Sequence, residues 1–167
     1  MNSKKFLAFA MAAAMTLSMT ACGGSGSGAA SSGTDSAAGT AFKLGGTGPL
    51  TGGASIYGLA AQRGAQIAVD EINAQGGAIQ FDLKYEDDQH DPEKAVNAYN
   101  ALKEWGMQIS LGSVTSQPGI STSALSQEDG IFALTPSASS PDVIAGKDNV
   151  YQMCFSDPNQ GLASAQY

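Results

Sequence analysis

Two periods of apolar residues alternate along the chain after residue 40. Between residues 79 and 85 a large apolar side chain stands at every second position, at Ile79, Phe81, Leu83 and Tyr85. Polar residues fill the gaps, so this stretch predicts a strand with one wet face, near a sheet edge. At helical spacing stand Ala61, Ala65, Ala68 and Ile72. They predict a helix that packs through this stripe, turns Asn73 outward and stops at Gly76 and Gly77.

The rest of the pattern predicts four more strands and three more helices. Short apolar runs predict strands at residues 41–44, 107–113, 131–135 and 150–155. A helix should follow Asp91, which suits a cap, and Pro92, which suits a first helical position, and should end at Gly106. Further helices are expected around residues 122–130 and after residue 156. Alternating strands and helices are typical of an α/β fold, a parallel sheet with helices on both faces.

Ligands of such sheets lie beyond the carboxyl ends of the strands. The loop at residues 45–58, which follows the first strand, is therefore a candidate binding segment. Six glycines stand between residues 42 and 58, a density that raises the question of a phosphate-binding loop. No lysine follows the glycines, the spacing of the dinucleotide motif is absent, and Pro49 removes a backbone donor. We therefore expect an open, glycine-rich rim for another small molecule, with Tyr57 as its aromatic wall.

Two later loops carry small hydroxyl residues. The stretch 112–119, "GSVTSQPG", leads from a strand into a helix, where free backbone N–H groups and the helix dipole favour an anion such as a carboxylate. The stretch "TPSASSP" follows the next strand and repeats the chemistry with Ser137 and Ser139. Simple helix capping by Thr115 and Ser116 would explain the first loop equally well. Together the two loops predict a polar, uncharged pocket.

Catalysis finds little support in the sequence. His90 is the one histidine and lies in an acidic turn, G-x-S-x-G is absent, and no cysteine–histidine cluster suggests zinc. The turn carboxylates Asp87, Asp88 and Asp91 suit solvent better than a cation. Cys154, between two apolar residues, is expected to be a buried thiol. We predict no enzyme, no catalytic residue, no cofactor and no metal.

The first 40 residues have a different composition from the rest. Two lysines precede an apolar run at residues 6–21, which predicts a secretory signal, although an uncleaved anchor is an alternative. The run ends in "MTACGG", which resembles the lipobox of bacterial lipoproteins and would make Cys22 the lipidated first residue. A free thiol at Cys22 is the alternative. Residues 22–41 are rich in Gly, Ser and Ala, typical of a flexible tether. The net charge of −7 argues against nucleic acid and anionic lipid as partners.

Six stretches carry a family resemblance: "GPLTGGASIYG", "GAQIAVDEINAQGG", "YEDDQHDPEKAV", "GSVTSQ", "EDGIFALTPSASSP" and "FSDPNQG". In order and spacing they resemble the amino-terminal lobe of the leucine/isoleucine/valine-binding proteins, the extracytoplasmic receptors of ABC transporters with the type I periplasmic-binding fold. The resemblance implies an amino-acid receptor that delivers its solute to ABC permease subunits. It also implies a lipid anchor on the outer face of the bacterial membrane. It implies ligand contacts at Tyr57, Val114, Thr115, Ser116, Ser137, Ala138 and Ser139.

The resemblance also implies a division of the chain and an incompleteness. Residues 1–21 would be the signal, 22–41 the tether, 42–155 lobe one, and 156–167 the crossover and the start of lobe two. The rest of lobe two and the return to lobe one would be missing, so we expect exposed apolar surface and weak or no binding of amino acids. A sensory lobe of a signalling receptor and an enzyme on a related sheet are the alternatives. The sequence does not specify the solute.

Overall fold

The computed structural model describes residues 41–167, and the predicted signal, Cys22 and the tether up to residue 40 lie outside this range. The elements in chain order are β1 (Ala41–Gly48), α2 (Ser55–Ala74), β2 (Gln80–Asp87), α3 (Pro92–Trp105), β3 (Ile109–Ser113), α4 (Ser116–Asp129), β4 (Ala133–Thr135), the 3-10 turn η1 (Pro141–Val143), β5 (Val150–Gln152) and α5 (Asp157–Gln166). No helix in this range is both long and apolar enough to span a membrane.

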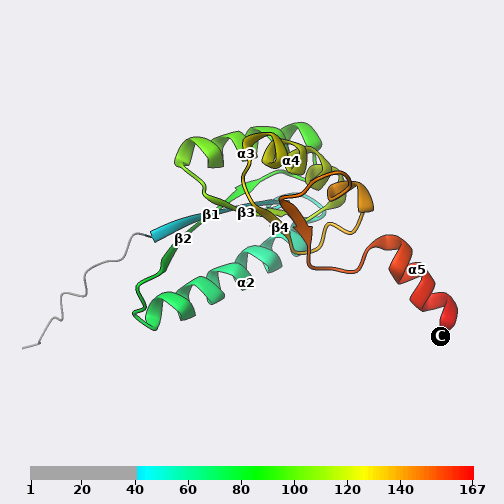
Figure 1. Ribbon diagram of the computed structural model, residues 1–167, viewed down its shortest axis with the longest axis horizontal. Helices are drawn as coiled ribbons and strands as arrows, with labels where there is room; N and C mark the ends of the chain where they lie inside the picture. The colour runs from blue at the N-terminus through cyan, green and yellow to red at the C-terminus, as the bar shows by residue number, and fades with distance from the viewer. Residues whose placement is uncertain (1–40) are drawn as a thin grey trace, which may run out of the picture. The chain divides into compact units, whose positions relative to one another are not determined.

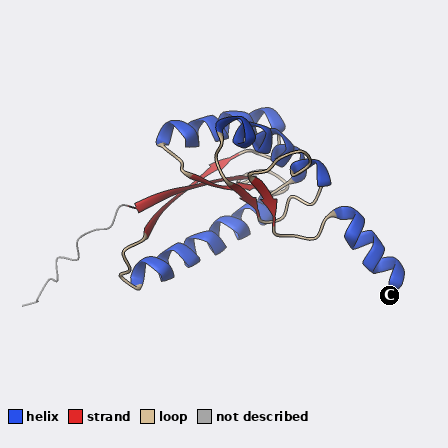
Figure 2. Ribbon diagram, viewed as in Figure 1, coloured by secondary structure: helices blue, strands red, loops and turns tan. Residues whose placement is uncertain are grey.

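The five strands form one parallel sheet with the order β2-β1-β3-β4-β5. Helix α2 lies on one face of the sheet, and α3 and α4 lie on the other (Figures 1 and 2). The predicted α/β class is therefore confirmed, and β2 is an edge strand as its alternating pattern indicated. Because all strands run in the same direction, the loops that follow β1, β3 and β4 open at the same end of the sheet.

Strand β1 is longer than predicted and takes in three of the glycines expected in the loop. Gly45, Gly46 and Gly48 pair with β2 residue by residue. A Cβ at Gly45 would overlap Met107, and one at Gly46 would meet the ring of Tyr85. These glycines let large side chains pack against the strand, so the expectation that they form a rim is wrong. Of the six, Gly52 and Gly53 alone stand in the open loop.

Helix α2 is turned relative to the predicted stripe. Gly58 and Val69 are its buried residues, whereas Ile72 is 42% exposed. Asn73 was expected on the wet side but donates to the carbonyl of Phe81 at 2.8 Å and accepts from its N–H at 2.9 Å. These two bonds satisfy backbone groups at the edge strand. The side of α2 that carries Val69 and Asn73 therefore faces the sheet, and Ile72 lies off that side.

Helix α3 begins and ends as predicted. The carboxylate of Asp91 accepts from the N–H groups of Glu93 and Lys94, both at 2.9 Å, and Pro92 occupies the first turn. Gly106 closes the helix at φ 94°, a left-handed conformation that favours glycine. The helix buries Tyr99 and Leu102 against Met107. Leu102 and Met107 also lie beside Gly45, so this cluster packs against β1.

The later elements differ in length from their predictions. Helix α4 starts at Ser116, six residues before the predicted stretch, so the candidate loop is its first turn. Strand β5 stops at Gln152, before Cys154, which is half-buried rather than buried. The expectation of a buried strand thiol is therefore wrong. Its side chain lies instead in the connection to α5.

Candidate functional site

An open hollow of about 420 Å³ lies at the carboxyl ends of the strands. The residues that line it come from four separate segments: Tyr57, Val114, Thr115, Ser116, Ser137, Ser139, Cys154 and Gln160. Six of the seven predicted ligand residues are in this set. The seventh, Ala138, is fully buried behind it, where its N–H donates to Thr135 and its carbonyl accepts from Gln152.

Ser116 and Ser139 are neighbours in space although 23 residues separate them. The Oγ of Ser116 accepts from the N–H of Ser139 and from the N–H of Ser140, both at 3.2 Å. This arrangement uses the lone pairs of the Ser116 hydroxyl and leaves its proton for another acceptor. The hydroxyl is thus oriented by the neighbouring loop to act as a donor into the hollow.

Val114 and Ser137 form a second link between the same two loops. The Ser137 hydroxyl donates to the Val114 carbonyl at 2.6 Å, and the Val114 N–H donates to the Thr47 carbonyl at 3.2 Å. The loops after β1, β3 and β4 are therefore held together by main-chain and hydroxyl bonds. Because these groups already have partners, Val114 and Ser137 support the wall more than they offer free donors.

The start of α4 is the most unusual feature of the hollow. Thr115 occupies the cap position but its side chain makes no capping bond, and its Oγ1 is buried without a partner. Simple capping, the alternative explanation of this loop, is therefore wrong for Thr115. Asp91, by contrast, caps α3 with its own carboxylate. The first amides of a helix lack intrahelical acceptors, so α4 presents them to whatever fills the hollow.

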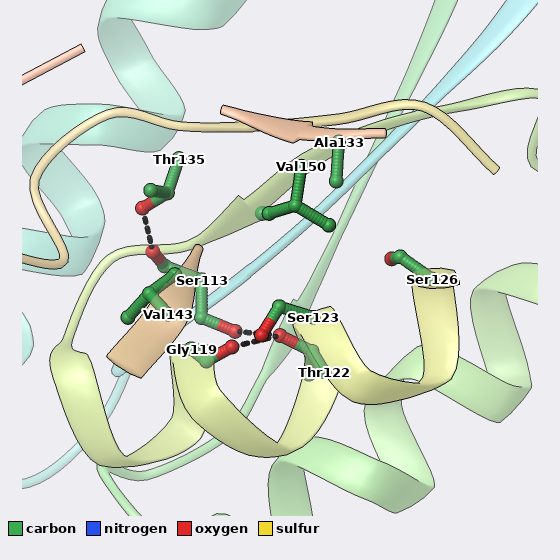
Figure 3. A pocket seen from close by; sticks show the side chains of 10 residues that line it. Ser113, Gly119, Thr122, Ser123, Ser126, Ala133, Thr135, Val143 and Val150 are labelled. Atoms are coloured by element: carbon green, nitrogen blue, oxygen red, sulfur yellow. Dashed lines mark hydrogen bonds between the residues drawn. The ribbon is translucent and has the colours of Figure 1, made fainter. Parts of the chain in front are cut away.

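Buried hydroxyls hold α4 against the sheet beneath this helix start (Figure 3). Ser113 Oγ lies 2.5 Å from Thr47 Oγ1 and 2.9 Å from Thr122 Oγ1, so one serine joins β1, β3 and α4. Thr135 adds a bond from β4 to the Ser113 carbonyl at 2.7 Å. The cavity among them measures about 10 Å³, roughly the space of one water molecule, which is too little for a solute. This layer positions α4 and is not itself the ligand site.

Asp87 fixes the first loop in place at the end of β2. Its carboxylate accepts from the Leu50 N–H at 2.8 Å and from the Thr51 hydroxyl at 2.5 Å. Burial acts to raise the pKa of Asp87, but the bonds from Thr51, Leu50 and Gln89 outweigh it and lower the pKa. The carboxylate therefore stays ionised and acts as an acceptor for the loop. It is a structural anchor of the glycine-rich segment.

The next residue, Asp88, has its pKa shifted in the opposite direction from that of Asp87. It is fully buried, its Oδ1 accepts from the His90 N–H at 2.9 Å, and its Oδ2 has no partner. Burial raises the pKa of Asp88, and the bond from His90 offsets this in part. His90 itself has a φ of 61°, as expected in a tight turn. Within residues 41–167 no group of three His, Cys, Asp or Glu side chains could hold a metal ion.

Two residues of the hollow, Cys154 and Gln160, were missed by the sequence reading. Both follow β5, and Gln160 belongs to α5, which the Asp157 N–H ties to the Ser139 carbonyl at 3.0 Å. No local pattern marks either residue, since their place depends on how the chain leaves the sheet. Tyr57 is 65% exposed at the opposite rim, so its ring borders the hollow without closing it.

Comparison with known proteins gives a match over the whole described range. The sequence profile of the periplasmic binding protein family matches residues 41–167. The Leu/Ile/Val-binding protein BraC3 of Rhizobium johnstonii is 38% identical over 122 residues, which cover 71% of this chain and 33% of that protein. The present chain thus spans about a third of the length of this relative.

Solved structures agree with the sequence match. The branched-chain amino acid transporter substrate-binding protein LivJ of Streptococcus pneumoniae, in complex with isoleucine, superimposes with a TM-score of 0.66 and 29% identity over 70% of this chain and 34% of that one. A solute-binding protein of an R. palustris ABC transporter, in complex with benzoate, superimposes with a TM-score of 0.65 and 26% identity. The match covers 74% of this chain and 35% of that one. The matched proteins are solute-binding proteins rather than enzymes, as the sequence predicted.

Proposed function

Since this chain belongs to the family of periplasmic binding proteins, we propose that it forms the carboxylate-binding lobe of a receptor that delivers amino acids to an ABC importer. The receptor's second lobe would close over the solute, and closure would be sensed by the permease. The proposed solutes are branched-chain amino acids, because relatives of this chain are named for binding them. This chain supplies one half of the binding site.

The observation that carries the proposal is the uncapped start of α4 beside the Ser116 hydroxyl. The N–H groups of Ser116 and Gln117 stand in the first turn, where a helix offers donors and a positive dipole end. The hydroxyl of Ser116 adds a donor that the amides of Ser139 and Ser140 orient. All these donors are uncharged, so they suit the carboxylate of a zwitterion.

The ligands of the relatives share the group that this site would hold. Isoleucine in the S. pneumoniae protein and benzoate in the R. palustris protein differ in almost everything except a carboxylate. A lobe that binds the common group leaves discrimination of the side chain to Tyr57 and to the second lobe. This division explains why the sequence of lobe one does not specify the solute.

We also propose that the mature receptor is held on the outer face of the membrane through lipid on Cys22. The basic start, the apolar run and the lipobox-like "MTACGG" support this, and the tether after Cys22 would give the lobe freedom to reach the permease. Mass spectrometry of the membrane-bound protein tests the proposal. A diacyl modification on Cys22 is expected, and an unmodified amino terminus elsewhere would contradict it.

Titration of the ¹⁵N-labelled chain with L-isoleucine, followed by NMR, tests the carboxylate site. We expect the amide signals of Ser116, Gln117 and Ser139 to shift and to saturate only at millimolar solute. Ser116→Ala should weaken this binding about tenfold, because a hydrogen bond to a charged group contributes about 1.5 kcal/mol.

Ser110→Ala is the matched control for Ser116→Ala. Ser110 is a buried serine of β3 that lies before the loop, and its hydroxyl accepts from the Gly112 N–H. Its loss should leave the titration unchanged even if the fold is slightly less stable. Shifts centred on residues outside the hollow, or an unaltered titration of Ser116→Ala, would contradict the proposed site.

A further inference from the structure

The side of α2 that points away from the sheet carries two exposed isoleucines. The helix packs on β1 and β2 through the side of Gly58 and Val69 (Figures 1 and 2). Ile56 and Ile67 each stand two residues before one of these, and two residues turn a helix by about 200°. Both side chains therefore point outward, where they are 71% and 59% exposed. An element that packs on the sheet beside α2 would leave this side open.

Two opposite charges flank Ile67 on the same outward face. Arg63 precedes it by four residues and Glu71 follows it by four, so the three side chains lie in one row along the helix. Both charged residues are exposed, and within residues 41–167 neither makes an ion pair. They are about 12 Å apart along the helix axis, too far to pair with each other. Glu71 also stands near the carboxyl end, where the helix dipole disfavours an acid.

This row of side chains is complementary to itself in the antiparallel orientation. When the Ile67 side chains of two copies meet on a two-fold axis, Arg63 of each copy lies opposite Glu71 of the other. Ala60 lies opposite Ala74 in the same way, and such small side chains let two helix axes approach within about 8–10 Å. A parallel pair would instead bring like charges together. The charge pattern therefore selects a second copy of this chain, in one orientation.

We propose that the chain forms a weak symmetric dimer through the outward face of α2, with the two helices antiparallel and Ile67 at the centre. Helix α2 has 20 residues, so it is about 30 Å long and 10 Å wide. A pair of such helices buries less than the roughly 1,200 Å² at which stable complexes begin. The dimer is therefore a transient contact that forms at high protein concentration.

The dimer leaves the hollow of each copy open. Tyr57 borders the hollow at the amino end of α2, about 15 Å along the helix from Ile67. In the antiparallel pair the two hollows lie near opposite ends of the contact. Association through α2 therefore requires no solute and blocks none.

Sedimentation equilibrium of the full chain tests this inference through a charge swap. The wild type is expected to be partly dimeric at about 0.5 mM, as a contact of this size is weak. Arg63→Glu and Glu71→Arg should each weaken the dimer about tenfold or more, because like charges then face each other. The double variant reverses both charges and should restore the dimer. All three should melt within a few degrees of the wild type, since both positions are exposed.

Phe132→Asp is the matched control, a change at a 44% exposed ring of the sheet. It should leave the dimer intact, and its loss would overturn the proposal, because the copies would then meet through the sheet. A wild-type chain that is monomeric at about 0.5 mM would also overturn it. So would a double variant that stays monomeric, or equal association of all variants. The measurement needs no solute, so a failure here is distinct from a failure of the proposed function.

Discussion

The Thr115 side chain shows how one residue in this fold departs from its commonest role. A threonine before a helix usually caps it, and here the hydroxyl is buried with no partner. A group left in that state costs about 1–3 kcal/mol unless a ligand supplies the bond. We therefore expect the contribution of the Thr115 hydroxyl to the stability of the protein to depend on whether a solute is bound.

Thr115→Val separates these two effects. Valine keeps the shape and removes the hydroxyl, so the chain alone should be as stable as before or more stable by up to about 1 kcal/mol. Binding of isoleucine should weaken if the hydroxyl contacts the solute. Urea denaturation and the NMR titration measure the two quantities. A clear loss of stability would mean that the hydroxyl already has a partner in the free protein.

Asp88→Asn tests the buried carboxyl of the turn. Burial raises the pKa of Asp88 in the folded state, so the folded chain holds the proton more tightly than the unfolded chain. Stability from this group is present at acid pH and is lost as pH rises through the folded pKa. Asparagine cannot ionise and keeps an oxygen for the His90 N–H. Its melting temperature should exceed that of the wild type by several degrees at about pH 7 and converge toward it at about pH 4.

The control for this comparison is Asp82→Asn, on the exposed side of β2. Its melting curve should follow the wild type at both pH values. A constant offset of Asp88→Asn across the pH range would show that a change in packing, and not the ionisation of Asp88, causes the effect. The pH dependence of stability is expected to have the opposite sign at Asp87, because its bonds to Leu50 and Thr51 lower its pKa and favour the charged form. Stability from Asp87 is therefore lost as the pH falls.

At the scale of the elements, glycines play two different parts in one helix. Gly58 of α2 lies against the backbone of Pro49, where a Cβ would overlap the carbonyl. Gly64, less than two turns later, has open space around the position of a Cβ. The first glycine lets the helix start close to the end of β1, and with it places Tyr57 at the hollow. The second has no such contact.

Gly58→Ala and Gly64→Ala form a matched pair on this helix. The first should destabilise the chain by about 1–3 kcal/mol, because backbone atoms cannot move away from the new methyl group. The second should stabilise it by up to about 1 kcal/mol, because alanine favours the helix. Thermal unfolding of the two variants measures both effects. Equal effects of the same sign would contradict the close packing at Pro49.

Element types were predictable from local chemistry, and their extents were less so. The caps of α3 follow from Asp91, Pro92 and Gly106, because capping is decided within a few residues. The length of β1 did not follow, because Gly45 and Gly46 accept strand pairing only when Met107 and Tyr85 fill the space beside them. The rotation of α2 was missed for the same reason, since Asn73 bonds to a strand eight residues away.

At the scale of the whole molecule, the proposed receptor needs a second wall for its binding site, which residues 41–167 do not supply. The hollow is open, with Tyr57 65% exposed at its rim. Water therefore competes for the donors of Ser116, and a single lobe cannot exclude it by closure. The affinity of the proposed receptor for its solute should therefore depend on the second lobe.

Calorimetry of the 167-residue chain with L-leucine and L-isoleucine tests whether affinity depends on the second lobe. We expect no heat of binding in the micromolar range, in keeping with the millimolar saturation expected by NMR. A chimera in which residues 41–155 replace the matched segment of BraC3 should recover affinity by at least 100-fold, since two lobes then close on the solute. Micromolar binding by the 167-residue chain itself would overturn the two-wall account.

The sequence by itself determined what short-range chemistry can encode. It gave the alternation of strands and helices, the caps of α3, and the hydroxyl character of the loops that contain Ser116 and Ser139. Tertiary structure alone decided which of these groups meet. The bond between Ser139 and Ser116 forms because parallel strands bring two distant loops to one end of the sheet. The bond from the Ser137 hydroxyl to the Val114 carbonyl joins the same two loops. No local pattern contains that information, since each contact joins segments far apart in the chain.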